Sequence, residues 1–211
     1  MLKTQIKASG VTNLTDARYF AAWGIDWLGF DLSTEGLREV PARRVKEIKD
    51  WIEGPTVVAE LGTDDFDTGR AIATELDMKA VQATQETPLT RVQSLRVPTI
   101  LQEINVLPDW SAKDLSANLS SRFGLVNLFL LNMTEASDTW SNFKKERSLK
   151  DWKEVLQRYD CLVEMNGTTA DWLEMLELLN PAGISLHGGH EEKVGYKSFD
   201  ELDDLLEALE I

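Results

Sequence analysis

The chain has 211 residues, of which 43% are hydrophobic and 27% charged, and its formal net charge is −14. These values are typical of a soluble globular protein with a sizeable core. The negative charge argues against a nucleic-acid partner, because phosphate neutralisation needs a basic face. No apolar run approaches the ~20 residues that span a bilayer, so we expect no membrane partner. We expect one domain over residues 1–211.

The cysteine content and the N-terminus bear on the cellular compartment. Cys161 is the single cysteine, so no internal disulfide can form, which fits a reducing cytosol. The first residues lack the apolar core of a signal peptide. The sequence therefore predicts a cytoplasmic protein.

Short apolar runs, several of them rich in Val, Ile, Leu or Phe at consecutive positions, predict strands buried on both faces. The predicted strands span residues 4–8, 27–31, 56–61, 80–83, 99–103, 125–131, 161–165 and 183–186.

Amphipathic segments separate these strands and predict helices. Thr12 or Asn13 can cap a first helix that runs through Trp23 and ends at Gly24. Further helices are predicted from Pro41 toward residue 54, from residue 64 or 65, after residue 87, and over 110–119, 148–159, 169–179 and 198–209. The 110–119 segment is polar and poorly patterned, so we expect this fifth helix to be irregular or short. Residues 133–147 form the longest predicted polar loop.

About eight βα repeats predict a single-domain α/β fold of the (β/α)₈ TIM-barrel class. The alternative is a doubly wound open sheet. The absence of Gly-x-Gly-x-x-Gly after the first strand argues against it.

Several motifs resemble one family of barrel enzymes. The chain reads Lys-Ala-Ser-Gly-Val-Thr-Asn from Lys7, Leu-Gly-Phe from Leu28, and Leu-Leu-Asn up to Asn132. Together with the glycine-rich end of the eighth unit, this resembles phosphoribosylanthranilate isomerase over nearly the whole chain. That resemblance implies a TIM barrel of tryptophan biosynthesis that converts an aminoaldose into an aminoketose by an Amadori rearrangement, without a cofactor or metal.

The resemblance also implies roles for individual residues. Ser9 stands where the family has its general base, a cysteine, and Asn132 stands where the family has its general acid, an aspartate. Arg38 takes the place of the arginine that helps hold the anthranilate carboxylate. Lys7 belongs to the same substrate-binding motif, and Ser185 replaces a family aspartate on the eighth strand.

A phosphate site is predicted in the last two βα loops, where barrels often bind phosphate through backbone N–H groups. Small residues that permit close backbone approach occur there, at Gly167, Thr168, Gly188 and Gly189. The alternative is that these glycines only form tight turns.

The two substitutions bear directly on catalysis. A serine hydroxyl needs a base of its own, and an asparagine cannot ionise, whereas each member of an acid–base pair contributes roughly 10²–10⁴-fold. We therefore expect isomerase activity to be weak or absent.

Other titratable residues stand at predicted strand ends and are candidates to replace the lost acid or base. Mutual repulsion between such carboxylates would raise a pKa, and a raised pKa suits a general acid. The candidates are Glu60, Glu103, Glu164 and His187, and Asp31 and Gln82 also stand at strand ends. Metal binding is disfavoured because no dedicated ligand spacing is visible.

Two functions from different classes remain. One is a divergent isomerase, and the other is a non-catalytic or repurposed barrel that binds a phosphorylated small molecule. A third interpretation gives the strand-end glutamates different acid–base work. In each case we expect a monomer or a homodimer.

Overall fold

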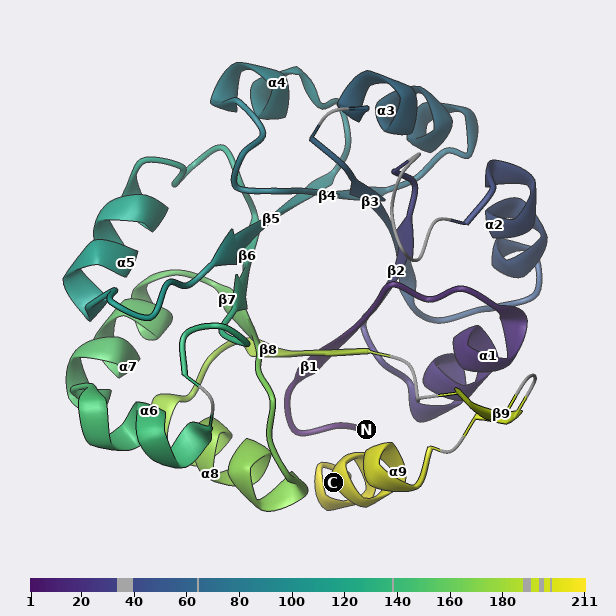
Figure 1. The fold of residues 1–211 in the computed structure, drawn as a ribbon. Coiled ribbons are helices and arrows are strands. Elements are labelled where there is room, and N and C mark those ends of the chain that lie inside the picture. Colours follow the sequence, from purple (N-terminus) through teal and green to yellow (C-terminus); the bar gives the residue numbers. More distant parts are fainter. Residues whose placement is uncertain (34–39, 64, 138, 188–190, 194–195, 198) are drawn as a thin grey trace.

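In the computed structural model, eight parallel strands close into a barrel in chain order, with β8 pairing back onto β1 (Figure 1). The structure describes residues 1–33, 40–63, 65–137, 139–187, 191–193, 196–197 and 199–211. The barrel strands are β1 Gln5–Ser9, β2 Trp27–Asp31, β3 Thr56–Leu61, β4 Ala80–Ala83, β5 Thr99–Asn105, β6 Leu128–Asn132, β7 Cys161–Glu164 and β8 Gly183–His187. The predicted TIM barrel is confirmed.

Helices form the outer ring around this barrel (Figure 1). They are α1 Leu14–Trp23, α2 Ala42–Lys49, α3 Phe66–Glu75, α4 Leu89–Ser94, α5 Ala112–Ser120, α6 Trp140–Glu146, α7 Leu149–Arg158, α8 Thr169–Leu179 and α9 Asp200–Ala208. Two short antiparallel strands, β9 Glu191–Lys193 and β10 Tyr196–Lys197, follow the barrel and were not predicted. Among the described helices, none is long and apolar enough to cross a membrane.

The first helix begins and ends at predicted residues. The Asn13 side chain accepts a hydrogen bond from the Asp16 N–H at 2.9 Å. At the other end, Gly24 adopts a φ of 70°, which an L side chain rarely tolerates. Both caps satisfy backbone groups that the helix itself leaves unpaired.

Two predictions about the fifth and sixth units were wrong. Helix α5 is a regular helix of nine residues, because Ser111 and Asp114 form a capping box that compensates for weak patterning. The predicted polar loop 133–147 contains helix α6, because Trp140 and Phe143 bury their rings against the barrel core.

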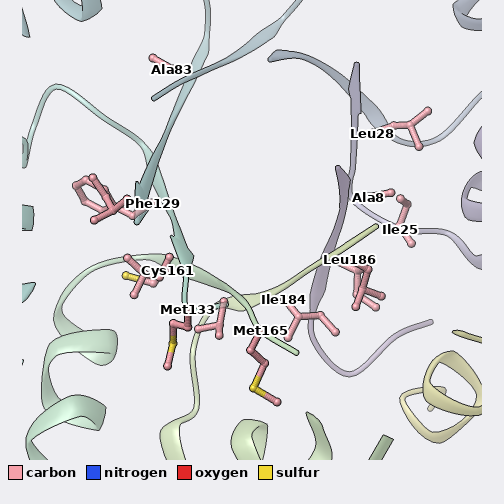
Figure 2. Close-up of a cluster of buried hydrophobic side chains, with 14 of the residues drawn as sticks. Ala8, Ile25, Leu28, Ala83, Phe129, Met133, Cys161, Met165, Ile184 and Leu186 are labelled. Atoms are coloured by element: carbon pink, nitrogen blue, oxygen red, sulfur yellow. The ribbon is translucent and has the colours of Figure 1, made fainter. Parts of the chain in front are cut away.

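The main core lies between the strands and the helices. Figure 2 shows side chains such as Leu28, Phe129, Ile184 and Leu186 pointing away from the barrel lumen. Full burial of such a side chain contributes about 1.5–3 kcal/mol. These alternate strand positions leave the intervening residues to face the lumen.

The lumen itself is apolar toward the N-terminal ends of the strands. A second buried cluster fills it there, with Trp27 packed against it; its members are Val58, Ala80, Leu101, Leu128 and Leu162. Such a plug makes the barrel a packed core rather than a pore. Toward the C-terminal ends of the strands the lumen instead holds buried polar side chains, among them Lys7, Ser9 and Ser185.

Candidate active site

The C-terminal ends of the strands surround a pocket of about 390 Å³. It is lined by Ser9, Gly10, Asp31, Glu60, Gln82, Glu103, Asn132, Glu164 and His187. Strand register explains why these residues meet: Ser9 pairs with His187, Asp31 with Glu60, and Asn132 with Glu164. The pocket thus collects the side chains that the sequence predicted at strand ends.

A buried ion pair lies directly beneath this pocket. Lys7 is completely buried, and its Nζ donates to Glu60 Oε1 and, at 2.5 Å, to Ser9 Oγ. The Gly10 N–H donates to Glu60 Oε2 at 3.0 Å. Both Glu60 oxygens are therefore engaged, and Glu60 compensates the Lys7 charge.

Gly29 on β2 provides the space for this ion pair. A Cβ at position 29 would overlap the Glu60 carboxylate and lie 2.9 Å from Lys7 Nζ. We expect Gly29→Ala to lower the free energy of unfolding by about 1–3 kcal/mol, as for other overpacked interiors. Urea unfolding at pH 7 measures this loss.

Gly69→Ala is the matched control for that substitution. Gly69 lies inside helix α3, and the atom nearest to its added Cβ would be the Leu61 Cδ2 methyl at 2.8 Å, the far end of a side chain that can shift. Alanine is favoured over glycine in helices by about 1 kcal/mol, so the control should cost little. An equal loss in both variants would contradict the role of Gly29 as a spacer for the ion pair.

Ser9 belongs to a hydrogen-bonded row of side chains. Its Oγ lies 2.9 Å from Ser185 Oγ, and Ser185 Oγ donates to Glu164 Oε2 at 2.9 Å. Because the single Ser185 proton is given to Glu164, Ser9 must donate to Ser185 and accept from Lys7. Among the described residues, no carboxylate or imidazole is hydrogen-bonded to the Ser9 hydroxyl; Glu164 connects to it only through Ser185.

His187 lies between two acceptors. Its Nε2 is 2.9 Å from Glu164 Oε1, and its Nδ1 is 3.2 Å from the Ser9 carbonyl oxygen. Only the imidazolium can donate from both nitrogens, so this geometry suits a charged ring paired with Glu164. Burial acts to raise the pKa of Glu164, but His187, Ser185 and Lys7 outweigh it and lower that pKa.

Glu103 has a different environment. Its Oε2 accepts from Gln82 Nε2 at 3.1 Å and its Oε1 from Asn132 Nδ2 at 3.2 Å. Burial raises its pKa; Asn132 and Lys7 act against this, Glu164 and Glu60 add to it, and the net direction is upward. Within the described part of the chain, no cation forms an ion pair with Glu103.

Asn132 is held in one orientation. Its Oδ1 accepts from the Thr134 N–H at 3.1 Å and from Thr134 Oγ1 at 2.6 Å. Its Nδ2 therefore faces Glu103 as a donor. Asn132 can orient a carboxyl group but has no acidic proton to transfer.

The predicted site residues fall into three groups. Ser9, Asn132, Glu60, Glu103, Glu164 and His187 line the pocket, and Lys7 and Ser185 are hydrogen-bonded to that group. Arg38, Gly188 and Gly189 lie outside the described residues. Gly167 and Thr168 lie at the start of helix α8 and do not line the pocket.

The start of helix α8 already holds an acidic side chain. The Thr168 N–H and Oγ1 both donate to Asp171 Oδ2, at 3.0 and 2.8 Å. A phosphate bound through the Thr168 N–H would have to displace this carboxylate. The phosphate site stays a prediction. Over the described residues, no group of three His, Cys, Asp or Glu side chains is arranged to hold a metal ion.

Three other residues take part in the site, and little or nothing in the sequence indicates their roles. Gln82 occupies a strand end like the glutamates, so its position was visible but its partner was not. Gly10 contributes a backbone N–H, and Thr134 acts on Asn132 from the following loop. Neither residue type marks such a role in a sequence.

The sequence matches no protein-family model and no curated protein. Solved structures resemble the fold over nearly the whole chain. Phosphoribosyl anthranilate isomerase from Thermotoga maritima has a TM-score of 0.73 at 19% identity, with 97% of each chain covered. The same enzyme from Thermococcus kodakaraensis has a TM-score of 0.74 at 15% identity, again with 97% of both chains covered.

The likeness extends to a differently named protein. KGPDC from Streptococcus mutans has a TM-score of 0.59 at 13% identity, covering 89% of this chain and 88% of its own. At such identities the likeness establishes the barrel fold. Activity depends on the residues that line the pocket at the C-terminal ends of the strands.

Proposed function

We propose that this protein is a divergent barrel of the phosphoribosylanthranilate isomerase family that binds a phosphorylated small molecule at its C-terminal mouth. The motifs around Ser9 and Asn132 support the family, and the whole-chain structural likeness agrees with it. One similar structure is an isomerase in complex with reduced 1-(o-carboxyphenylamino)-1-deoxyribulose 5-phosphate. A cytoplasmic monomer or homodimer connected to tryptophan biosynthesis is part of this proposal.

The rearrangement itself is proposed to be weak or absent. The observation that carries this is how the side chains of Ser9 and Asn132 are hydrogen-bonded. The Ser9 hydroxyl is hydrogen-bonded to the Lys7 ammonium and to Ser185, and the Asn132 amide is fixed by Thr134. Neither group can accept a proton from carbon or supply one to the ring oxygen, so positioning alone remains.

A second candidate is acid–base work by the glutamates on another substrate. Glu103 favours it, because this buried carboxyl has a raised pKa and contacts the residue at the family's acid position. A carboxyl of that kind is suited to protonate an oxygen or nitrogen of a bound substrate.

Purified protein assayed with phosphoribosylanthranilate tests the proposal. We expect kcat/KM at least about 10²-fold below that of the Thermotoga maritima enzyme measured alongside, since both proton-transfer groups are replaced. Glu103→Gln asks whether Glu103 supplies the proton transfer that remains. Residual turnover of phosphoribosylanthranilate that disappears in this variant assigns the transfer to Glu103, whereas unchanged turnover shows that Glu103 takes no part in that reaction.

Complementation of a tryptophan auxotroph lacking the isomerase gives a second readout. Robust growth at ordinary expression would contradict the proposed loss of activity. Binding of the reduced product analogue, measured by calorimetry, addresses the ligand part separately. No detectable binding at millimolar concentration would sink the phosphorylated-ligand proposal.

A further inference from the structure

Glu103 is a carboxyl group placed between two amide side chains. Gln82 on β4 and Asn132 on β6 flank it, at 3.1 and 3.2 Å from its two oxygens. An amide can offer a carboxyl either an N–H donor or a carbonyl acceptor. Which atom each amide presents decides which protonation state of Glu103 is held.

The two amides differ in how their orientation is fixed. Asn132 must present its Nδ2, because Thr134 already donates twice to its Oδ1. Gln82 has no such constraint. The residue is 7% exposed, and its Oε1 is buried without a hydrogen-bond partner among the described residues. A buried carbonyl without a donor is unfavourable.

Turning the Gln82 amide by half a rotation exchanges its oxygen and nitrogen, which ordinary structures do not distinguish. The oxygen would then occupy the place that lies 3.1 Å from Glu103 Oε2. The amide nitrogen would take the present place of Oε1, so Gln82 makes one hydrogen bond to Glu103 in either orientation. An acceptor at that position fits a proton on Glu103 Oε2.

We propose that Glu103 is held as a neutral carboxylic acid, with its proton on Oε2 shared with the Gln82 carboxamide oxygen. Asn132 then donates to the unprotonated Oε1. Gln82 is a positioning residue, which acts on substrate only through Glu103. The role of this proton in catalysis rests on the second candidate function, acid–base work by the glutamates.

The charged groups around Glu103 agree with a neutral acid. Glu164 and Glu60 disfavour a further negative charge, and Lys7 favours it. However, Lys7 is engaged by Glu60 and Ser9, and His187 is engaged by Glu164. The nearby cations are therefore already committed to other acceptors.

The proposed proton transfer balances simply. The Glu103 proton passes to a basic oxygen or nitrogen of the bound substrate, and Glu103 becomes a carboxylate. The Gln82 amide then turns so that its Nε2 donates to Oε2. The ligand group facing Glu103 is accordingly a neutral acceptor, such as a ring oxygen, carbonyl or imine, and not a carboxylate or phosphate.

Two spectroscopic measurements on the full chain, without substrate, test the inference. In protein labelled with ¹³C-glutamate, the Glu103 carboxyl resonance is identified by its loss in Glu103→Gln. We expect its midpoint to lie above the ordinary glutamate value of 4.5. The Gln82 side-chain amide signal should shift with the same midpoint. A Glu103 midpoint at or below 4.5, or a Gln82 signal that does not move with it, overturns the inference.

Infrared spectroscopy examines the shared proton directly. The carbonyl stretch of protonated Glu103 should move to higher frequency in Gln82→Met, because the amide acceptor is removed. Gln102→Met is the matched control: Gln102 is also buried, its Oε1 also has no partner in the described part of the chain, and its Nε2 donates to the Thr84 carbonyl instead. An unchanged stretch in Gln82→Met, or equal shifts in both variants, contradicts the proposal.

Neither measurement depends on the substrate. If Glu103 is neutral but phosphoribosylanthranilate is not bound, the proposed family function fails and this inference stands. If the ligand binds while Glu103 titrates at or below the ordinary value, this inference fails alone.

Discussion

Replacing Ser9 by Cys and Asn132 by Asp together should raise isomerase kcat/KM by about 10²-fold or more, since each proton-transfer group contributes roughly 10²–10⁴-fold. Ser9 Oγ lies 2.5 Å from the Lys7 ammonium. A thiol in that place would be stabilised as the thiolate, which is the form that acts as a base. Ser9→Cys therefore restores the base in an environment that favours it.

Asn132→Asp restores the acid by a different route. The Asn132 Nδ2 lies 3.2 Å from Glu103 Oε1, so the substitution places two carboxyl groups within hydrogen-bond distance. Two such groups cannot both ionise easily, and one proton is held between them. The pair then carries an acidic proton near neutral pH, which the asparagine cannot.

Steady-state kinetics on the double variant and both single variants measure the gain. We expect most of it only in the double variant, because both transfers are needed in one turnover. Ser120→Cys, which adds a thiol on the exposed end of helix α5, controls for a general effect of the new thiol. A folded double variant with no gain would mean that other replaced residues, Ser185 among them, also block the reaction.

Replacing Lys7 by Met should lower the free energy of unfolding by about 3–5 kcal/mol, the usual effect of removing one partner from a buried ion pair. Lys7 is fully buried, and its ammonium contacts Glu60 and Ser9. Methionine fills a similar volume, so the loss reports charge rather than a cavity. Glu60 and Glu164 would then share the interior without their nearest buried cation.

Urea unfolding at pH 7, followed by circular dichroism, measures this loss. Adding Glu60→Gln to Lys7→Met should recover part of it, because the uncompensated carboxylate is removed. Arg43→Met is the surface control: Arg43 pairs with Glu47 at 3.1 Å on exposed helix α2, where a pair contributes less than about 1 kcal/mol. A loss below that of the control would show that the ion pair does not stabilise the barrel.

The sequence predicted the strands well because strands buried on both faces are uniformly apolar. Strands β2, β3 and β4 begin and end at the predicted residues. Strand β5 continues to Asn105, past the predicted end at residue 103, because pairing with β6 extends to Asn132. Because the last residues of β5 are polar, the apolar pattern that predicts strands does not extend to them.

The helices were harder to predict where tertiary packing, rather than periodicity, stabilises them. Helix α6 has only two buried residues, Trp140 and Phe143, and a polar remainder. Its stacked rings and the cap at Thr139 compensate for a short apolar stripe. A search for long periodic segments passes over a helix of this kind.

For the site, the strand-end rule placed the glutamates around one mouth. It could not assign their partners, because those depend on contacts across the lumen. Glu60 engages Lys7, Glu164 engages His187, and Glu103 is left between amides. Three glutamates with the same sequence signal therefore have three different electrostatic environments.

Cys161 has a practical consequence for chemical labelling. It is completely buried on β7, and burial raises the pKa of its thiol, so water-borne alkylating reagents should leave it intact. In Ser9→Cys the introduced thiol would line the pocket beside the Lys7 ammonium, which favours the thiolate, and would be the more reactive of the two thiols. Protection of that thiol from alkylation would then report occupancy of the pocket by any compound, whether or not it is turned over.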